Sequence, residues 1–156
     1  MNLKKIDGNL TDSPTKVSQV LIPEKRKEVK LPLFLESVSA GFPSPADDYL
    51  EGKLDLNDLL VRNPTATFFV RVTGDSMIDS GIFSDDILVV DRSLEPKSGS
   101  IVIAVIDAEL TVKRLHKQKN KVFLLPENQN YKPIEITKEM SFEVWGVVTT
   151  VIHSVL

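Results

Sequence analysis

A serine and a lysine in this sequence stand in contexts that can support nucleophilic catalysis. Ser76 lies in Val72–Met77, directly after an apolar stretch, and Gly74 precedes it by two positions. A serine hydroxyl is a poor nucleophile until a base takes its proton. Lys113 lies in the apolar run Leu110–Leu115. A lysine acts as a base only when neutral, so its pKa must fall several units below the reference value near 10.4, which burial among apolar groups can achieve.

The residues around Ser76 can also supply an oxyanion hole. Gly74 lets the backbone turn sharply, which leaves the N–H groups of Asp75 and Ser76 free to bind the oxyanion of a tetrahedral intermediate. Losing one such donor typically costs about 2.7–4 kcal/mol. Taken alone, the Gly-Asp-Ser sequence is more typical of an ordinary β-turn, and Lys113 of a lysine on a solvated edge strand. Neither motif by itself shows whether its serine or lysine is catalytic or only part of the fold.

A third feature is the pair Ala40–Gly41, which opens the breaker-rich segment Gly41–Pro45 and marks the clearest boundary in the chain. Small side chains obstruct attack on a peptide bond least, so this pair suits a cleavage site. A loop of small residues is the alternative interpretation. Ala40 precedes Ser76 by 36 positions, and Ser76 precedes Lys113 by 37.

In this order and at these separations, the three motifs resemble the LexA-type self-cleaving serine peptidases, and among them the UmuD/MucA-like SOS mutagenesis proteins. The resemblance extends from Gly41 to the C-terminus, about three quarters of the chain. The matching stretches are Gly41–Ala46, Asp55–Asn57, Gly74–Asp79, Thr111–Arg114 and Trp145–Val148. Ala40 agrees with the LexA-type repressors and MucA, whereas UmuD has cysteine there. The leader of 40 residues is longer than the arm of UmuD.

The resemblance implies a mechanism and a set of partners. Lys113 is the general base, Ser76 is the nucleophile, and the N–H groups of Asp75 and Ser76 bind the oxyanion during cleavage of Ala40–Gly41. Residues 1–40 are then a flexible arm that self-cleavage removes, and residues 41–156 are a β-rich peptidase and interaction domain. The implied function is that of an accessory subunit of an error-prone translesion DNA polymerase. The implied partners are a RecA filament on single-stranded DNA, a UmuC-like Y-family polymerase subunit and a second copy of the chain, with no cofactor.

Three other functions are compatible with the same chemistry or fold. A LexA-type transcriptional repressor needs a helix-turn-helix module before the cleavage site, and residues 1–40 lack helical periodicity. A signal-peptidase-like enzyme normally has a membrane anchor, and the apolar stretches here are too short for one. A non-cleaving polymerase adaptor with the same fold would not need Ser76, Lys113 and Ala40–Gly41 together.

The amino-acid composition excludes several further classes of function. The 156 residues are 42% hydrophobic, enough for one domain with a core. The formal net charge of −3 argues against a broad nucleic-acid-binding surface, and no direct sequence-specific DNA binding is expected. There is no cysteine, which excludes disulfides, thiolate zinc sites and cysteine nucleophiles. His116 and His153 lack paired ligand spacing, so no metal site is expected, although a Ser76–His–Asp triad stays open. Without a signal peptide or membrane segment, the cytoplasm is the expected location.

The pattern of apolar residues predicts an all-β domain, either a sandwich or a partly open barrel of short strands. The predicted strands are Thr67–Val72, Ile87–Val90, Ile101–Ile106, Leu110–Leu115, Lys121–Leu125, Ile134–Ile136 and Glu143–Ile152. A tight hairpin is expected at 107–109, and a short helix at 55–60. Residues 1–30 show no sustained pattern and predict an extended, weakly ordered leader. Residues 29–40 predict a strand at a sheet edge, because Pro32 favours an edge over a central position.

Overall fold

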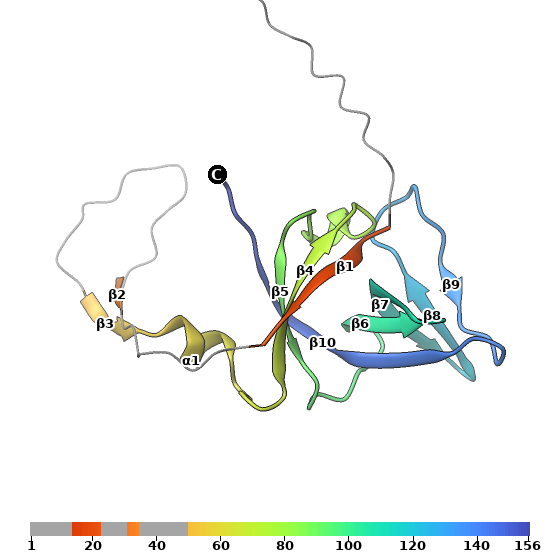
Figure 1. Cartoon of the computed structure of the whole chain (residues 1–156), viewed down its shortest axis with the longest axis horizontal. Helices are drawn as coiled ribbons and strands as arrows, with labels where there is room; N and C mark the ends of the chain where they lie inside the picture. Colours follow the sequence, from red (N-terminus) through yellow and green to blue (C-terminus); the bar gives the residue numbers. More distant parts are fainter. Residues whose placement is uncertain (1–13, 23–30, 35–49) are drawn as a thin grey trace, which may run out of the picture.

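The computed structural model describes residues 14–22, 31–34 and 50–156. Within these residues the chain is mostly β-structure, as Figure 1 shows. The main sheet consists of β1 (Lys16–Leu21), β4 (Thr67–Thr73), β5 (Ile87–Asp91), β6 (Ile101–Ile106), β7 (Glu109–Gln118), β8 (Lys121–Leu125), β9 (Ile134–Glu135) and β10 (Phe142–Ile152). Every strand expected from residue 67 onward is confirmed, with bounds that differ by a few residues at most.

The strands of the main sheet follow one another in the order β1-β4-β5-β10-β6-β7-β8-β9, and all pairings are antiparallel. A further pairing of β1 with β7, through Lys16 and Thr111, closes the first part of this series into a ring. Strands β8 and β9 extend the sheet beyond the ring from β7. The fold is therefore the partly closed barrel that the sequence pattern predicts.

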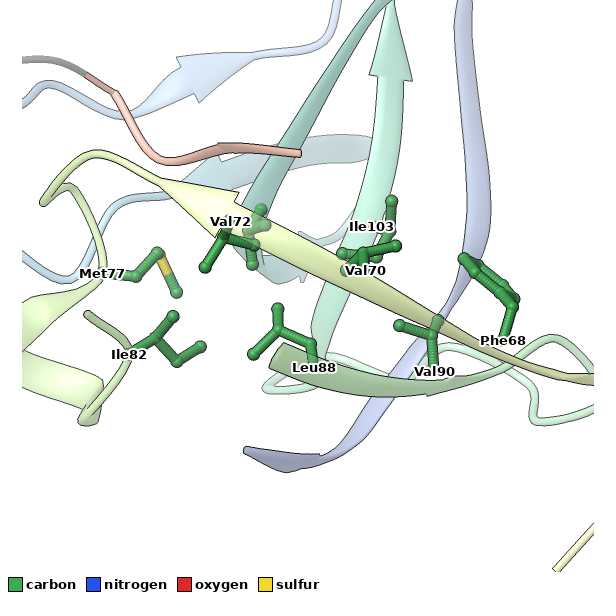
Figure 2. Packing of buried hydrophobic residues seen from close by; sticks show 9 residues of the cluster. Phe68, Val70, Val72, Met77, Ile82, Leu88, Val90 and Ile103 are labelled. Atoms are coloured by element: carbon green, nitrogen blue, oxygen red, sulfur yellow. The ribbon is translucent and has the colours of Figure 1, made fainter. Parts of the chain in front are cut away.

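The interior of the ring is filled by side chains that alternate along its strands. Phe68, Val70 and Val72 point inward from β4, as the two-residue period of a strand requires, and all three are buried. Figure 2 shows these side chains packed around a common centre with residues of β5 and β6 and of the loop after β4. The other members of this cluster are Met77, Ile82, Leu88, Val90, Ile103 and Val112. A second cluster, on the other face of β6 and β7, consists of Val102, Ala104, Leu115 and Leu124.

The expected turn and the expected helix are both present. Asp107 and Ala108 join β6 to β7 with φ values of 48° and 69°, the left-handed conformations that a two-residue hairpin turn uses. The helix α1 (Leu56–Leu60) begins after Asp55, whose side chain accepts a hydrogen bond from the N–H of Asn57 at 2.7 Å. This is an N-cap, which satisfies a backbone donor that the first helical turn leaves unpaired.

One expectation for the N-terminal part of the chain was wrong and one was confirmed. The leader is not weakly ordered throughout, because residues Lys16–Leu21 form β1 and pair with β4. The segment around Pro32 does contain an edge strand: β2 (Leu31–Phe34) pairs on one side with β3 (Leu50–Leu54), in a two-stranded sheet separate from the main one. Ala40 and Gly41 lie outside the described residues, so the cleavage site and the domain boundary remain predictions from the sequence.

Candidate active site

The loop that carries Ser76 is fixed at both of its ends. Gly74 follows β4 with φ of 93°, a left-handed conformation that favours glycine, and it turns the chain away from the strand. Met77 is fully buried in the first cluster, as Figure 2 shows, and anchors the other side of the loop. A short 3-10 helix, η1 (Ile78–Ser80), follows. Ser76 itself is 0% exposed, so its hydroxyl lies in a site shielded from bulk water.

Lys113 reaches Ser76 from β7. Its Nζ lies 2.9 Å from the Oγ of Ser76, which is hydrogen-bond distance. The lysine is 3% exposed, and its neighbours on the same face of the sheet, Val102 and Leu115, are apolar and buried. Burial lowers the pKa of Lys113 to about 8. The two residues that the sequence singled out separately are therefore adjacent, and the lysine has the lowered proton affinity that a base at near-neutral pH requires.

Two further acceptors surround Nζ of Lys113. The hydroxyl of Thr111 lies 3.0 Å away and the carbonyl oxygen of Val112 lies 2.9 Å away. A neutral amine has two N–H groups and one lone pair. Thr111 and Val112 can accept the two N–H groups, which leaves the lone pair directed at the hydroxyl of Ser76. The arrangement therefore orients the lysine to accept a proton from serine.

A second loop, residues 126–131, holds the backbone of the nucleophile loop in place. The N–H of Glu127 donates to the carbonyl of Ser76 at 2.8 Å, and the Nδ2 of Asn128 donates to the carbonyl of Asp75 at 2.9 Å. The hydroxyl of Tyr131 donates to the carboxylate of Asp75. Within the described part of the chain, no acceptor takes the N–H groups of Asp75 and Ser76. These are the two donors that the sequence proposes for an oxyanion.

The start of β1 also reaches the site. The N–H of Thr15 donates to the Oγ of Ser76 at 2.8 Å, and the carbonyl of Thr15 accepts from Val112 N–H at 3.4 Å and from the hydroxyl of Thr111 at 3.3 Å. Thr15 is fully buried. Beside it, a cavity of about 320 Å³ is lined by residues of β7, among them Lys113, and by the leader residues Pro14 and Lys16. A segment of the leader thus contacts both candidate catalytic residues or their immediate neighbours.

The histidines lie in other surroundings. The Nδ1 of His153 is 2.6 Å from the buried carboxylate of Asp86, and its ring lies against Phe83, whereas His116 lies against Phe123. The hydrogen bonds of Ser76 Oγ go to Lys113 and Thr15. A Ser76–His–Asp triad is therefore not formed by the described residues. In residues 14–22, 31–34 and 50–156 there is no group of three or more acidic or histidine side chains that can hold a metal, and no helix long and apolar enough to cross a membrane.

The fold and the paired serine and lysine define a class of protein that comparison with known sequences identifies. The chain belongs to the Peptidase S24-like family, whose model matches residues 32–149. This is the family of LexA-type serine–lysine peptidases that cut their own chains.

Among curated relatives, the chain is 52% identical to the protein SamA of Salmonella typhimurium over 122 residues, which cover 78% of this chain and 84% of SamA. It is 46% identical to the protein MucA of Escherichia coli over 127 residues, 81% of this chain and 84% of MucA. It is 45% identical to the protein ImpA of Shigella flexneri over 128 residues, 78% of this chain and 83% of ImpA. The chain is accordingly a UmuD-like SOS mutagenesis protein, of the kind that serves as a subunit of an error-prone polymerase.

Four residues of the site were missed by reasoning from the sequence. Thr111 could have been found, because residues two apart on a strand share a face, and it is two positions from Lys113. Asn128 and Tyr131 lie in an irregular loop that has no periodic signal. Thr15 lies in a segment whose pattern gave no reason to expect a strand, and its contact with Ser76 spans 61 positions.

Proposed function

We propose that Ser76 and Lys113 form the catalytic dyad of self-cleavage, that the bond cut is Ala40–Gly41, and that cutting divides the chain into an arm of residues 1–40 and a working domain of residues 41–156. The observation that carries this proposal is the 2.9 Å separation of Lys113 Nζ from Ser76 Oγ, at a buried lysine whose pKa is lowered to about 8.

The reaction follows from these groups. Neutral Lys113 takes the proton of the Ser76 hydroxyl as Oγ attacks the carbonyl carbon of Ala40. The resulting oxyanion accepts hydrogen bonds from the N–H groups of Asp75 and Ser76. Protonated Lys113 gives its proton to the departing amine of Gly41, which leaves an ester between Ser76 and Ala40. Water, deprotonated by Lys113, hydrolyses this ester and frees residues 1–40.

Tethering makes such a site effective without strong substrate binding. The scissile bond belongs to the same chain, or to a second copy in a homodimer, so its effective concentration is high. The rate is then governed by how often Ala40–Gly41 enters the site in an extended, attackable form. A RecA filament on single-stranded DNA would act by favouring that form.

The proposal extends to the partners. The shortened protein, residues 41–156, would act in the cytoplasm as a homodimer that binds a UmuC-like Y-family polymerase subunit. The support for this step is the identity to SamA, MucA and ImpA over most of their lengths. No direct sequence-specific contact with DNA is required, in keeping with the net charge of −3.

The dyad is tested by substitution in the full chain. Ser76→Ala and Lys113→Ala should each leave the chain uncut after incubation with RecA, single-stranded DNA and nucleotide, as followed by gel electrophoresis. The matched control is Lys117→Ala, which removes an exposed lysine from the same strand, β7. This control should cut at the wild-type rate. Cutting at Ala40–Gly41 in either dyad variant would refute the proposal.

A further inference from the structure

We propose that the groove between β4 and β7 is a peptide-binding site for an extended strand, and that its resting occupant is this chain's own segment 14–22, which keeps Ser76 from its substrate. This inference rests on the proposed function of Ser76. It adds a second role to the leader: besides containing the bond that is cut, it restrains the cutting.

The first observation is how completely the segment fills the site. Strand β1 pairs with β4 through five residue pairs and reaches β7 through Lys16 and Thr111. Just before the strand, Thr15 is fully buried and its N–H and carbonyl are both hydrogen-bonded to residues of the site. Nothing else can pair with this edge of β4 while β1 is in place.

The second observation is the geometry at Ser76. The N–H of Thr15 points at Oγ from 2.8 Å, and an N–H bond lies in the plane of its peptide. Oγ therefore lies close to the plane of the peptide between Pro14 and Thr15, on the side opposite its carbonyl oxygen. Nucleophilic attack requires approach from above that plane, along the direction in which the new bond forms. The segment thus occupies the site in an orientation that cannot be cut.

The hydrogen bond from Thr15 also acts on the nucleophile itself. Ser76 Oγ has two lone pairs, and one of them accepts a hydrogen bond from the N–H of Thr15. The Nζ of Lys113 forms a second hydrogen bond with the same hydroxyl group. An oxygen that already accepts a hydrogen bond is a weaker nucleophile. The segment therefore obstructs both the entry of a substrate and the attack by serine.

A third observation indicates that the restraint is weak enough to be released. The Oγ1 of Thr15 is buried without a hydrogen-bond partner among the described residues. Leaving a polar atom unsatisfied in the interior is unfavourable, and β1 meets β7 at one residue pair. Displacement of β1 vacates the edge of β4, where a cleavage segment carrying Ala40–Gly41 can then bind as a strand.

The test compares basal cleavage, without RecA, in two variants of Thr15 in the full chain. Thr15→Pro removes the N–H that donates to Ser76 and should raise the basal rate about tenfold. Thr15→Val keeps the N–H and the shape but removes the unpaired hydroxyl, so it should hold β1 more firmly and lower the basal rate about threefold. Gln19→Ala, an exposed position on the same strand, is the control and should cut at the wild-type rate.

The outcomes separate this inference from the proposed function. A Thr15→Pro variant that folds but cuts no faster than wild type would overturn the restraint. If Thr15→Pro does not fold, Thr15→Val decides: slower cutting supports the restraint, and equal or faster cutting overturns it. Adding Ser76→Ala to each variant should abolish cutting. Persistent cutting in those double variants would instead overturn the assignment of Ser76.

Discussion

Two strands of the ring, β10 and β1, differ in how many residue pairs join them to their neighbouring strands. Strand β10 lies between β5 and β6 and pairs with each of them through five residue pairs. Strand β1 has five pairs with β4 on one side but a single pair with β7 on the other. The part of the barrel formed by residues 67–152 is thus built around β10, and the ring is closed by a strand from the segment that self-cleavage is proposed to remove. In this proposal, the strand that closes the barrel is also the strand that restrains the active site.

The largest expected effect concerns Lys113, which lies on the β1 side of the ring. With its pKa lowered to about 8 by burial, the neutral fraction of Lys113 should rise about ninety-fold from pH 6 to pH 9 and then level off. The rate of cleavage without RecA should follow this curve, measured by gel densitometry in protein that remains folded. A rate that keeps rising towards pH 10.4 would mean that the lysine is not desolvated when it acts.

The same lowered pKa has a consequence for stability. The unfolded chain binds the lysine proton more tightly than the folded chain, so between pH 8 and about 10.4 the free energy of unfolding should rise with pH. Below pH 8 both states are protonated and Lys113 contributes no pH dependence. The uncut Ser76→Ala variant permits the measurement, and replacing Lys113 by Met in that background should remove the slope.

A substitution in β10 should destabilise the part of the barrel formed by residues 67–152. A Cβ added at Gly146 would lie 2.7 Å from Cγ1 of Val90 and 3.1 Å from the carbonyl oxygen of Asp91. Gly146→Ala should therefore lower the free energy of unfolding by about 1–3 kcal/mol, as judged by urea denaturation. If the urea midpoint is unchanged, β10 and β5 can separate slightly without loss of stability. The proposed difference between the tightly held β10 and the weakly held β1 would then lose support.

The loop of residues 126–131 offers a comparison with β1, because both contact the nucleophile loop. Asn128→Ala removes the donor to the carbonyl of Asp75 and should slow RecA-stimulated cutting about tenfold, whereas loss of the β1 contact is expected to accelerate basal cutting. The control is Gln129→Ala, in the same loop. If Asn128→Ala lowers the melting temperature but leaves the rate of RecA-stimulated cutting unchanged, the loop contributes to the stability of the fold and not to cleavage.

The smallest effect is expected at Val17, which packs against the first cluster from β1. Val17→Ala should lower the free energy of unfolding by about 1 kcal/mol, less than Gly146→Ala, because Val17 is only partly buried. It should also raise basal cutting a few-fold, since β1 then leaves the groove more readily. If Val17→Ala lowers the free energy of unfolding without faster cutting, the packing of β1 stabilises the fold but does not control the rate of cleavage.

The sequence predicted the strands from residue 67 onward well and the structure of the N-terminal segment poorly. Strands such as Thr67–Thr73 and Ile101–Ile106 bury apolar side chains at regular intervals, so their pattern is visible locally. Strand β1 is held chiefly by backbone hydrogen bonds to β4, and four of its side chains are exposed, so its composition resembles that of a loop. The order and spacing of the motifs predicted Ser76 and Lys113 as site residues. Thr15 contacts the site through its backbone N–H and Asn128 through its side-chain amide, and no local pattern in the sequence indicates either contact.

The central claim is most directly tested by intact mass spectrometry of the full chain after incubation with RecA, single-stranded DNA and nucleotide. The account predicts two products, one ending at Ala40 and one beginning at Gly41, in wild type and in neither Ser76→Ala nor Lys113→Ala. A cut at another bond, or the same two masses from the Ser76→Ala chain, would contradict it.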